Sequence, residues 1–147
     1  MKIRQLSLFL ENRPGQLRAP AKALGDAGID ILTMSLADTQ QFGILRLVVR
    51  DWERARRVLE EAGQVVNVTD VLAVDVPDRP GGLAETLGAF EEAGLGIEYM
   101  YPFTNHERGG HATLVFRLED PDAAARALSA RGVKLVGAEE LFRRVGA

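Results

Sequence analysis

Apolar and polar residues alternate at the start of the chain. Across residues 2–11, Leu6, Leu8 and Leu10 fall on one face, opposite Ser7. This period of two is typical of a strand with one buried face. The sequence therefore predicts a first strand over residues 2–11.

The next segment changes to helical spacing. Leu17, Ala21 and Leu24 recur at positions i, i+4 and i+7, and the stripe ends at Gly28. This spacing predicts a helix that Gly28 ends. Pro20 lies inside the stripe, and a proline beyond the first turn removes a backbone hydrogen bond. We therefore expect this helix to start late or to bend.

Four further segments complete a unit. Residues 29–38 are strand-like, residues 40–43 contain turn residues, and residues 44–50 alternate again, which predicts a β-hairpin. Residues 52–63 return to helical spacing, and residues 64–69 predict a fourth strand. The order of the predicted elements is βαββαβ.

The second half of the chain repeats this pattern at an offset of 66 residues. Leu72, Val74 and Val76 correspond to the three leucines of the first strand. After a longer hairpin at residues 105–110 the offset becomes 69, so three residues are added there. The repeat predicts two tandem units, residues 1–70 and residues 71–147. Because a unit of this size has a marginal core, we expect the two units to pack together.

One short motif occurs once in each unit, between the first strand and the first helix. It reads Asn-Arg-Pro-Gly-Gln-Leu at residues 12–17 and Asp-Arg-Pro-Gly-Gly-Leu at residues 78–83. Pro-Gly alone indicates only a turn. Its duplication in the same context favours a binding loop, because the N–H groups at a helix start can hold an anion such as an amino-acid carboxylate.

Composition excludes several classes of function. The 147 residues include no cysteine, which excludes disulfides and thiolate metal sites, and 46% are hydrophobic. No apolar run approaches the roughly 20 residues that span a bilayer, so we expect a cytoplasmic protein without membrane contact. The net charge of −3 argues against binding to nucleic acid. The sequence predicts that the arginines of residues 54–57 and Arg143-Arg144 are solvated.

Catalytic and metal-binding chemistry finds little support. His106 and His111 flank a hairpin tip with Glu107 between them, and a surface metal site there would need further ligands. No Gly-x-Ser-x-Gly motif is present, so we expect no catalysis, no metal and no cofactor. RNA-recognition modules share the βαββαβ order but stack bases on exposed aromatic residues, which residues 44–50 lack.

The order of the predicted elements and the duplicated sequence motifs resemble the ACT domain, a module that senses amino acids in metabolic enzymes and regulators. The motifs are Arg-Pro-Gly-x-Leu at residues 13–17 and 79–83, and Ala-Gly-Ile or Ala-Gly-Leu at residues 27–29 and 93–95. The resemblance covers nearly the whole chain and implies the α+β class, with two tandem ferredoxin-like βαββαβ modules whose sheets pack side by side. It implies a stand-alone regulatory protein without a catalytic domain.

The resemblance also implies two ligand sites, each joining the loop of one module to the second strand of the other. The residues of the first site would be Asn12, Gly15, Gln16, Leu17, Gly96, Ile97 and Tyr99. The residues of the second site would be Asp78, Gly81, Gly82, Leu83, Asp30, Ile31 and Thr33. The chain departs from the family in having Asp30 and Gly96 where an Asn is common.

We therefore expect a regulatory protein that binds an aromatic or branched-chain amino acid, forms a homodimer and signals to a metabolic enzyme. A Val at position 15 or 81 is expected to abolish the ligand response and leave the fold intact. The alternative is a ligand-independent subunit that binds a partner enzyme. Phe9, Val48 and Val115 lie on strand faces away from the predicted core and could form its surface.

Overall fold

The computed structural model of the chain describes residues 1–38, 40–104 and 109–145. The chain divides into two compact units. The N-terminal unit is Arg4–Thr69, and the C-terminal unit is Asp70–Ala147 together with Met1–Ile3. Each unit is described by itself.

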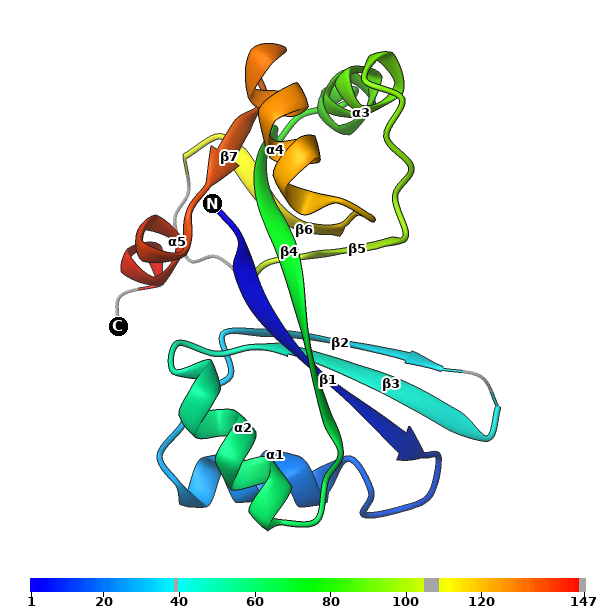
Figure 1. Cartoon of the computed structure of the whole chain (residues 1–147), viewed down its shortest axis with the longest axis vertical. Coiled ribbons are helices and arrows are strands. Elements are labelled where there is room, and N and C mark those ends of the chain that lie inside the picture. The colour runs from blue at the N-terminus through cyan, green and yellow to red at the C-terminus, as the bar shows by residue number, and fades with distance from the viewer. Residues whose placement is uncertain (39, 105–108, 146–147) are drawn as a thin grey trace. The chain divides into compact units, whose positions relative to one another are not determined.

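The N-terminal unit has the predicted order of elements. They are β1 (Ile3–Glu11), α1 (Arg18–Asp26), β2 (Thr33–Asp38), β3 (Phe42–Val48), α2 (Trp52–Glu61) and the first part of β4 (Val66–Pro77). The strand order is β2-β3-β1-β4, and β3 pairs antiparallel with both β1 and β2. Both helices lie on one face of this sheet (Figure 1), where Leu6, Leu8 and Leu10 are buried as predicted.

The C-terminal unit repeats the fold and adds a helix. Its elements are the rest of β4, α3 (Gly82–Glu92), β5 (Tyr99–Pro102), β6 (His111–Arg117), α4 (Pro121–Ala130), β7 (Lys134–Val136) and α5 (Ala138–Arg144). The strand order is β5-β6-β4-β7, so both units have the ferredoxin-like arrangement. The core contains Phe90 and Phe116, whose ring centroids lie 4.8 Å apart. The sequence pattern did not predict α5.

One strand replaces two predicted ones. We expected residues 64–69 to end one strand and Val71 to begin another, but β4 runs without a break from Val66 to Pro77. No glycine or proline occurs in it before Pro77, so nothing in the sequence ends the strand at the boundary of the two units.

The second strand of each unit is shorter than predicted. Residues 29–32 were expected to be extended, yet β2 begins at Thr33. Gly28 has φ +71, its N–H donates to Gly25 O at 3.0 Å, and the N–H of Ile29 donates to Leu24 O at 2.9 Å. These two bonds form a Schellman motif, so buried Ile29 packs at a helix end rather than in a strand.

The same motif ends α3, because Gly94 N–H donates to Glu91 O and Leu95 N–H donates to Phe90 O. Gly96 and Ile97 therefore precede β5. The predicted late start of α1 is confirmed: the helix begins at Arg18, and Pro20 is its third residue. In a first turn the missing N–H of proline costs nothing. Among the described residues, no helix is long and apolar enough to cross a membrane.

Candidate ligand site at the strand–helix corners

The two Pro-Gly corners have the same backbone geometry. Gly15 has φ +88 and Gly81 has φ +86. The N–H of Asn12 donates to Gln41 O at 2.8 Å, and the N–H of Asp78 donates to Gly110 O at 3.0 Å. Each corner is thus tied to the hairpin of its own unit. Side chains with a Cβ are strained at such φ values, so a Val at either glycine would distort the loop itself.

The helices begin differently at the two corners. The second begins at Gly82, whereas Gln16 at the equivalent position still lies in a turn before α1. The hydrogen bond is the same at both, because Gln16 N–H donates to Arg13 O at 3.2 Å and Gly82 N–H donates to Arg79 O at 3.0 Å. A Cβ on Gly82 would overlap the carbonyl oxygen of Pro77. This contact explains Gly82 by packing, without a ligand.

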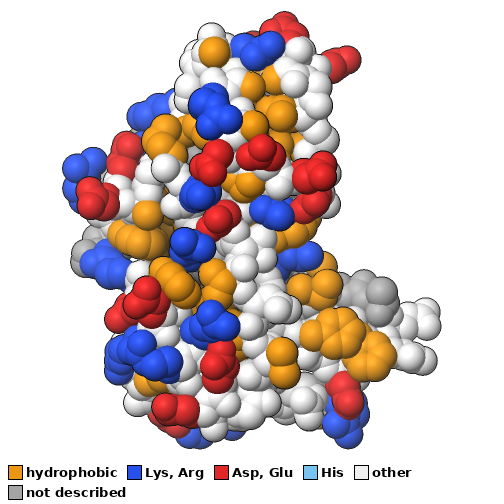
Figure 2. All heavy atoms as spheres, viewed as in Figure 1, with side chains coloured by type: hydrophobic (Ala, Val, Ile, Leu, Met, Phe, Trp, Pro, Cys, Tyr) orange, Lys and Arg blue, Asp and Glu red, His pale blue; other side chains and the backbone are white. Residues whose placement is uncertain are grey.

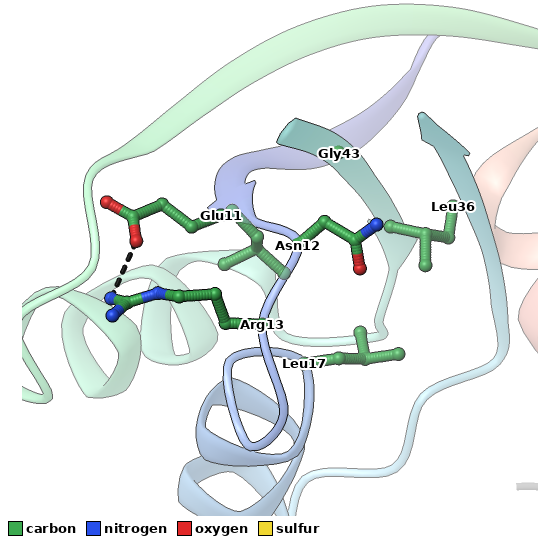
Figure 3. A pocket seen from close by; sticks show the side chains of 7 residues that line it. Glu11, Asn12, Arg13, Leu17, Leu36 and Gly43 are labelled. Atoms are coloured by element: carbon green, nitrogen blue, oxygen red, sulfur yellow. Dashed lines mark ion pairs between the residues drawn. The ribbon is translucent and has the colours of Figure 1, made fainter. Parts of the chain in front are cut away.

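A cavity of about 110 Å³ opens at the first corner. Its lining residues come from β1, β2, β3 and the loop before α1: Leu10, Glu11, Asn12, Arg13, Leu17, Leu36 and Gly43. Figure 3 shows the side chains of Asn12 and Leu36 reaching toward one another, with Leu17 beside them. Glu11 and Arg13 point to the other side, where their ion pair measures 2.6 Å. Asn12, Leu17 and Leu36 therefore lie on one side of the cavity, away from the ion pair.

Asn12 and Leu17, two of the predicted ligand-binding residues, line this cavity together with Leu36 and Gly43, which were not predicted. Gly43 pairs with Leu10 in the sheet and brings no side chain to the cavity that it lines. The equivalent residue of the other unit is Ala112, which pairs with Val76. The signal that was available is a glycine inside a strand, which often marks a close approach or an opening.

A larger groove of about 430 Å³ adjoins this cavity at Leu17. It lies between α1 and the strands β2 and β3, and its lining is Leu17, Arg18, Ala21, Leu24, Ile31, Met34, Leu45 and Leu47. Met34 and Leu17 are 43% and 38% exposed, so apolar surface remains open to solvent. The predicted residue Ile31 thus shares a groove with Leu17 of the same unit.

Some polar groups at this corner are not used by the hydrogen bonds within the unit. Asn12 Nδ2 donates to Gln40 O at 3.1 Å, which directs the amide nitrogen to the hairpin. Among the described residues, no backbone acceptor is found for the N–H groups of Leu17 and Arg18. Such unpaired donors are expected in the first turn of a helix. They and the amide oxygen of Asn12 can bind a small polar ligand.

The other predicted site residues are dispersed within their units. Asp30 is exposed in the loop before β2, and Thr33 is buried. Gly96 and Ile97 line a cavity of about 360 Å³ at the end of α3. Tyr99 is half-buried and stacks on Tyr101 with a centroid distance of 6.5 Å. At the second corner, Leu83 is 40% exposed.

A buried ionic cluster in the C-terminal unit was not predicted. Asp75 on β4 accepts hydrogen bonds from Thr113 Oγ1 at 2.8 Å and from both terminal nitrogens of Arg144 at 2.9 and 3.0 Å. The side chains of Asp75 and Arg144 are only 5% and 7% exposed. The prediction that Arg144 is solvated is therefore wrong, because α5 brings it onto the sheet. Glu140 and Arg144 at i and i+4 were the available signal.

The cluster changes the pKa of its members. Burial alone raises the pKa of Asp75, but hydrogen bonds from Arg144 and Thr113 and the charges of Arg144 and His111 lower it below the ordinary 3.8. The hydrogen bond from Arg144 to Asp75 raises the pKa of the guanidinium further. The pair is therefore ionised at neutral pH.

Two further points concern the expected partner surface and the metal site considered at the hairpin. Val48 and Val115 are fully buried, so they form no free partner surface; Phe9 remains 65% exposed and stacks on Phe42 at 5.0 Å. His106 and Glu107 lie outside the described residues, and among the described ones no group of three potential metal ligands exists.

Comparison with known proteins places this geometry in a family. A sequence model of the family described as an ACT domain pair matches residues 1–145. None of the curated proteins matches the chain. Protein BT0572 from Bacteroides thetaiotaomicron is a similar solved structure, with 35% identity, a TM-score of 0.88, and coverage of 97% of this chain and 96% of that one.

More distant structures show the same fold. The ligand-free regulatory subunit of aspartate kinase from Thermus thermophilus has 18% identity and a TM-score of 0.60, with 86% of this chain and 91% of that chain covered. Aspartate kinase from Synechocystis has 23% identity and a TM-score of 0.55, with 92% of this chain and 26% of that chain covered.

Proposed function

The chain belongs to the ACT domain pair family, and from this membership we propose that it is a regulatory protein that binds a free amino acid. ACT domains are regulatory, non-catalytic modules, and similar folds include regulatory subunits of aspartate kinase. We place the ligand at the Pro-Gly corner of the N-terminal unit. We propose that Asn12, Gly15, Gln16 and Leu17 bind the ligand there.

One observation carries this proposal: a small cavity with polar groups and an apolar groove share Leu17 as a lining residue. An amino acid has the same division, with charged groups at one end and a side chain at the other. The N–H groups of Leu17 and Arg18 at the positive end of α1 suit its carboxylate. The amide oxygen of Asn12 suits its ammonium. The apolar groove favours a branched-chain or aromatic side chain.

The second corner is proposed as an unequal site. It has Asp78 in place of Asn12, and a carboxylate binds an ammonium more strongly than an amide does. Gly81 and Leu83 repeat Gly15 and Leu17. The roles of Asp30, Ile31, Gly82, Gly96, Ile97 and Tyr99 in binding stay predictions.

A second candidate function is binding of a partner enzyme or of a second copy of the chain. The exposed stack of Phe9 and Phe42 favours it, since large apolar side chains in contact on a surface often mark an interaction site. In the view of Figure 2, hydrophobic side chains gather on the N-terminal unit near its hairpin end. The two functions are compatible, because a regulator needs a partner that responds to its ligand.

The test is a thermal-shift panel of the twenty amino acids followed by calorimetry, because a ligand that prefers the folded state raises the melting temperature. We expect a branched-chain or aromatic amino acid to stabilise the protein. Leu17→Glu places a carboxylate in the cavity and the groove and should abolish this binding. Gly43→Ala adds one methyl group to the cavity and should weaken binding less.

The control is Val65→Glu, which adds the same charge at a residue that is 79% exposed. It should leave binding unchanged. Loss of binding in Leu83→Glu alone would move the site to the second corner. If no amino acid binds the wild-type chain, or if Leu17→Glu binds as well as the control, the proposed site is wrong.

A further inference from the structure

Phe9 and Phe42, which stack on each other, belong to β1 and β3, the strands next to the proposed ligand site. Their ring centroids lie 5.0 Å apart, and the ring planes are inclined by 17°. In the sheet, Phe42 pairs with Glu11, two residues after Phe9. The two rings are therefore diagonal neighbours on one face of the sheet. Phe9 is mostly exposed, so burial in a core does not explain its place in the sequence.

Asn12 follows β1 directly and continues the pairing of these two strands. Its backbone N–H donates to Gln41 O at 2.8 Å, and its side-chain nitrogen Nδ2 donates to Gln40 O at 3.1 Å. The second bond orients the amide, with its nitrogen toward the turn and its oxygen on the side of Leu17 in Figure 3. The orientation of Asn12 therefore depends on where Gln40 and Gln41, the turn residues before β3, are held.

The C-terminal unit also has a cross-strand pair at the positions equivalent to the two phenylalanines. These residues are Asp75 and His111, whose atoms Oδ2 and Nε2 lie 3.6 Å apart. The same backbone hydrogen bond follows them, because Asp78 N–H donates to Gly110 O. Arg144 of α5 contributes two further hydrogen bonds to Asp75. Each unit thus joins its two strands beside the corner, one with aromatic rings and the other with polar groups.

We propose that Phe9 and Phe42 are positioning residues for the amino-acid site at Asn12. The stack restrains the start of β3, and the carbonyl groups of Gln40 and Gln41 immediately before it hold Asn12. Aromatic pairs at this separation contribute more than the area that they bury, so even an exposed pair reduces fraying at a strand end. The inference rests on the proposed function and deepens it, because it assigns part of the ligand affinity to residues outside the cavity.

The first test needs no ligand. Hydrogen exchange of the Asn12 backbone N–H, measured by NMR, reports how firmly the turn holds this group. Phe9→Ala removes the stack and should accelerate this exchange about fivefold, within the range that aromatic pairs contribute. The N–H of Asp78 is the internal control, since it should exchange as in the wild type. A loss of stability in the whole protein would accelerate the exchange of both groups.

Three further variants separate the stack from general effects of substitution. Phe9→Tyr keeps the ring, and the added hydroxyl group of this exposed side chain reaches solvent, so Asn12 should exchange as in the wild type. Phe42→Ala removes the other half of the stack and should act like Phe9→Ala. Val65→Ala shortens an exposed apolar side chain that lies on neither β1 nor β3, and it should leave the exchange of Asn12 unchanged.

The second test is calorimetry with L-leucine and L-phenylalanine as probes. Phe9→Ala and Phe42→Ala should weaken binding about fivefold, whereas Phe9→Tyr and Val65→Ala should retain the wild-type affinity. Equal exchange of Asn12 in Phe9→Ala and in the wild type, or an unchanged affinity, overturns the inference. Binding of neither probe to the wild type contradicts the proposed function. The exchange of Asn12 tests the stack without any ligand, so the two failures are distinct.

Discussion

The outer faces of the two sheets differ at equivalent strand positions. Phe9 on β1 is 65% exposed, whereas Asp75, 66 residues later, has a side chain only 5% exposed. Helix α5 explains the difference, because its residue Arg144 pairs with Asp75. The N-terminal unit has no equivalent of α5 within its described residues. An element outside the repeat therefore decides whether the same strand position is surface or interior.

Small residues explain the differences between the cavities. Gly43 opens a cavity at the corner of the N-terminal unit, where the C-terminal unit has Ala112. Ala123 lines a cavity after α3 in the C-terminal unit, and the equivalent residue 69 positions earlier, Arg54, donates from its guanidinium to Ala27 O. The two repeats thus keep one backbone and differ in where side chains leave space. This comparison predicts which substitutions act in one unit and not in the other.

The largest effect is expected for Arg144→Ala. The substitution removes both hydrogen bonds to Asp75 and leaves a buried carboxylate without its main partner. Breaking a buried ion pair in this way should cost about 3 kcal/mol in the free energy of unfolding. Urea denaturation measures this loss.

The neighbouring residue provides the control for that experiment. Arg143 is exposed, so Arg143→Ala should change the free energy of unfolding by less than about 0.5 kcal/mol. Equal losses from the two variants would show that α5 does not hold the cluster in place.

A smaller loss is expected for Gly82→Ala, about 1–3 kcal/mol, because the new methyl group overlaps the carbonyl of Pro77 and forces the backbone to shift. The equivalent position in the other unit already carries a side chain, so Gln16→Ala should be nearly neutral. Thermal unfolding of both variants tests this contrast. A neutral Gly82→Ala would remove the packing explanation for Gly82.

The smallest effect concerns pH and Asp75. Its pKa is lowered in the folded state, so as pH falls the unfolded chain takes up the proton first. The stability that the ionised carboxylate contributes is therefore complete above the ordinary value of 3.8 and is lost as pH falls through the folded-state pKa. Asp75→Asn should be less stable than the wild type at pH 7, and this difference should shrink in acid.

Urea denaturation over a pH series measures that difference. The matched variant in the N-terminal unit is Phe9→Asn, whose difference from the wild type should not depend on pH in this range, because no titrating group is exchanged. A wild-type advantage over Asp75→Asn that stays constant into acid would contradict the lowered pKa.

Periodicity predicted the architecture well. Leu6, Leu8 and Leu10 are buried as their alternation requires. The strands β3 and β6 begin 69 residues apart, which is the offset that the sequence repeat predicted for this part of the chain. These features follow from neighbours in sequence, since alternation directly reports which face of a strand is apolar. The family and its fold were accessible for the same reason.

The apolar residues after each helix were wrongly assigned to a strand, because a strand and a helix end can both contain such residues. Ile29 and Leu95 suit a strand, yet each follows a left-handed glycine and packs at a helix end. A strand and a Schellman helix end both place an apolar residue after Gly28 or Gly94, and only the backbone hydrogen bonds distinguish the two structures. The strand assignment therefore began four residues too early in each unit.

The features that the sequence pattern did not predict depend on contacts between residues that are distant in the sequence. Asp75 and Arg144 are 69 positions apart, and each alone has the sequence character of a surface charge. The contact of Arg54 with the end of α1 and the cavity beside Ala123 likewise depend on which helix end lies next to each residue. The linear pattern determined the repeats, the cores and the two glycine corners, because those depend on local periodicity and backbone conformation. The tertiary structure decided which charges are buried and where cavities open, because burial and free space depend on what the chain brings in from elsewhere.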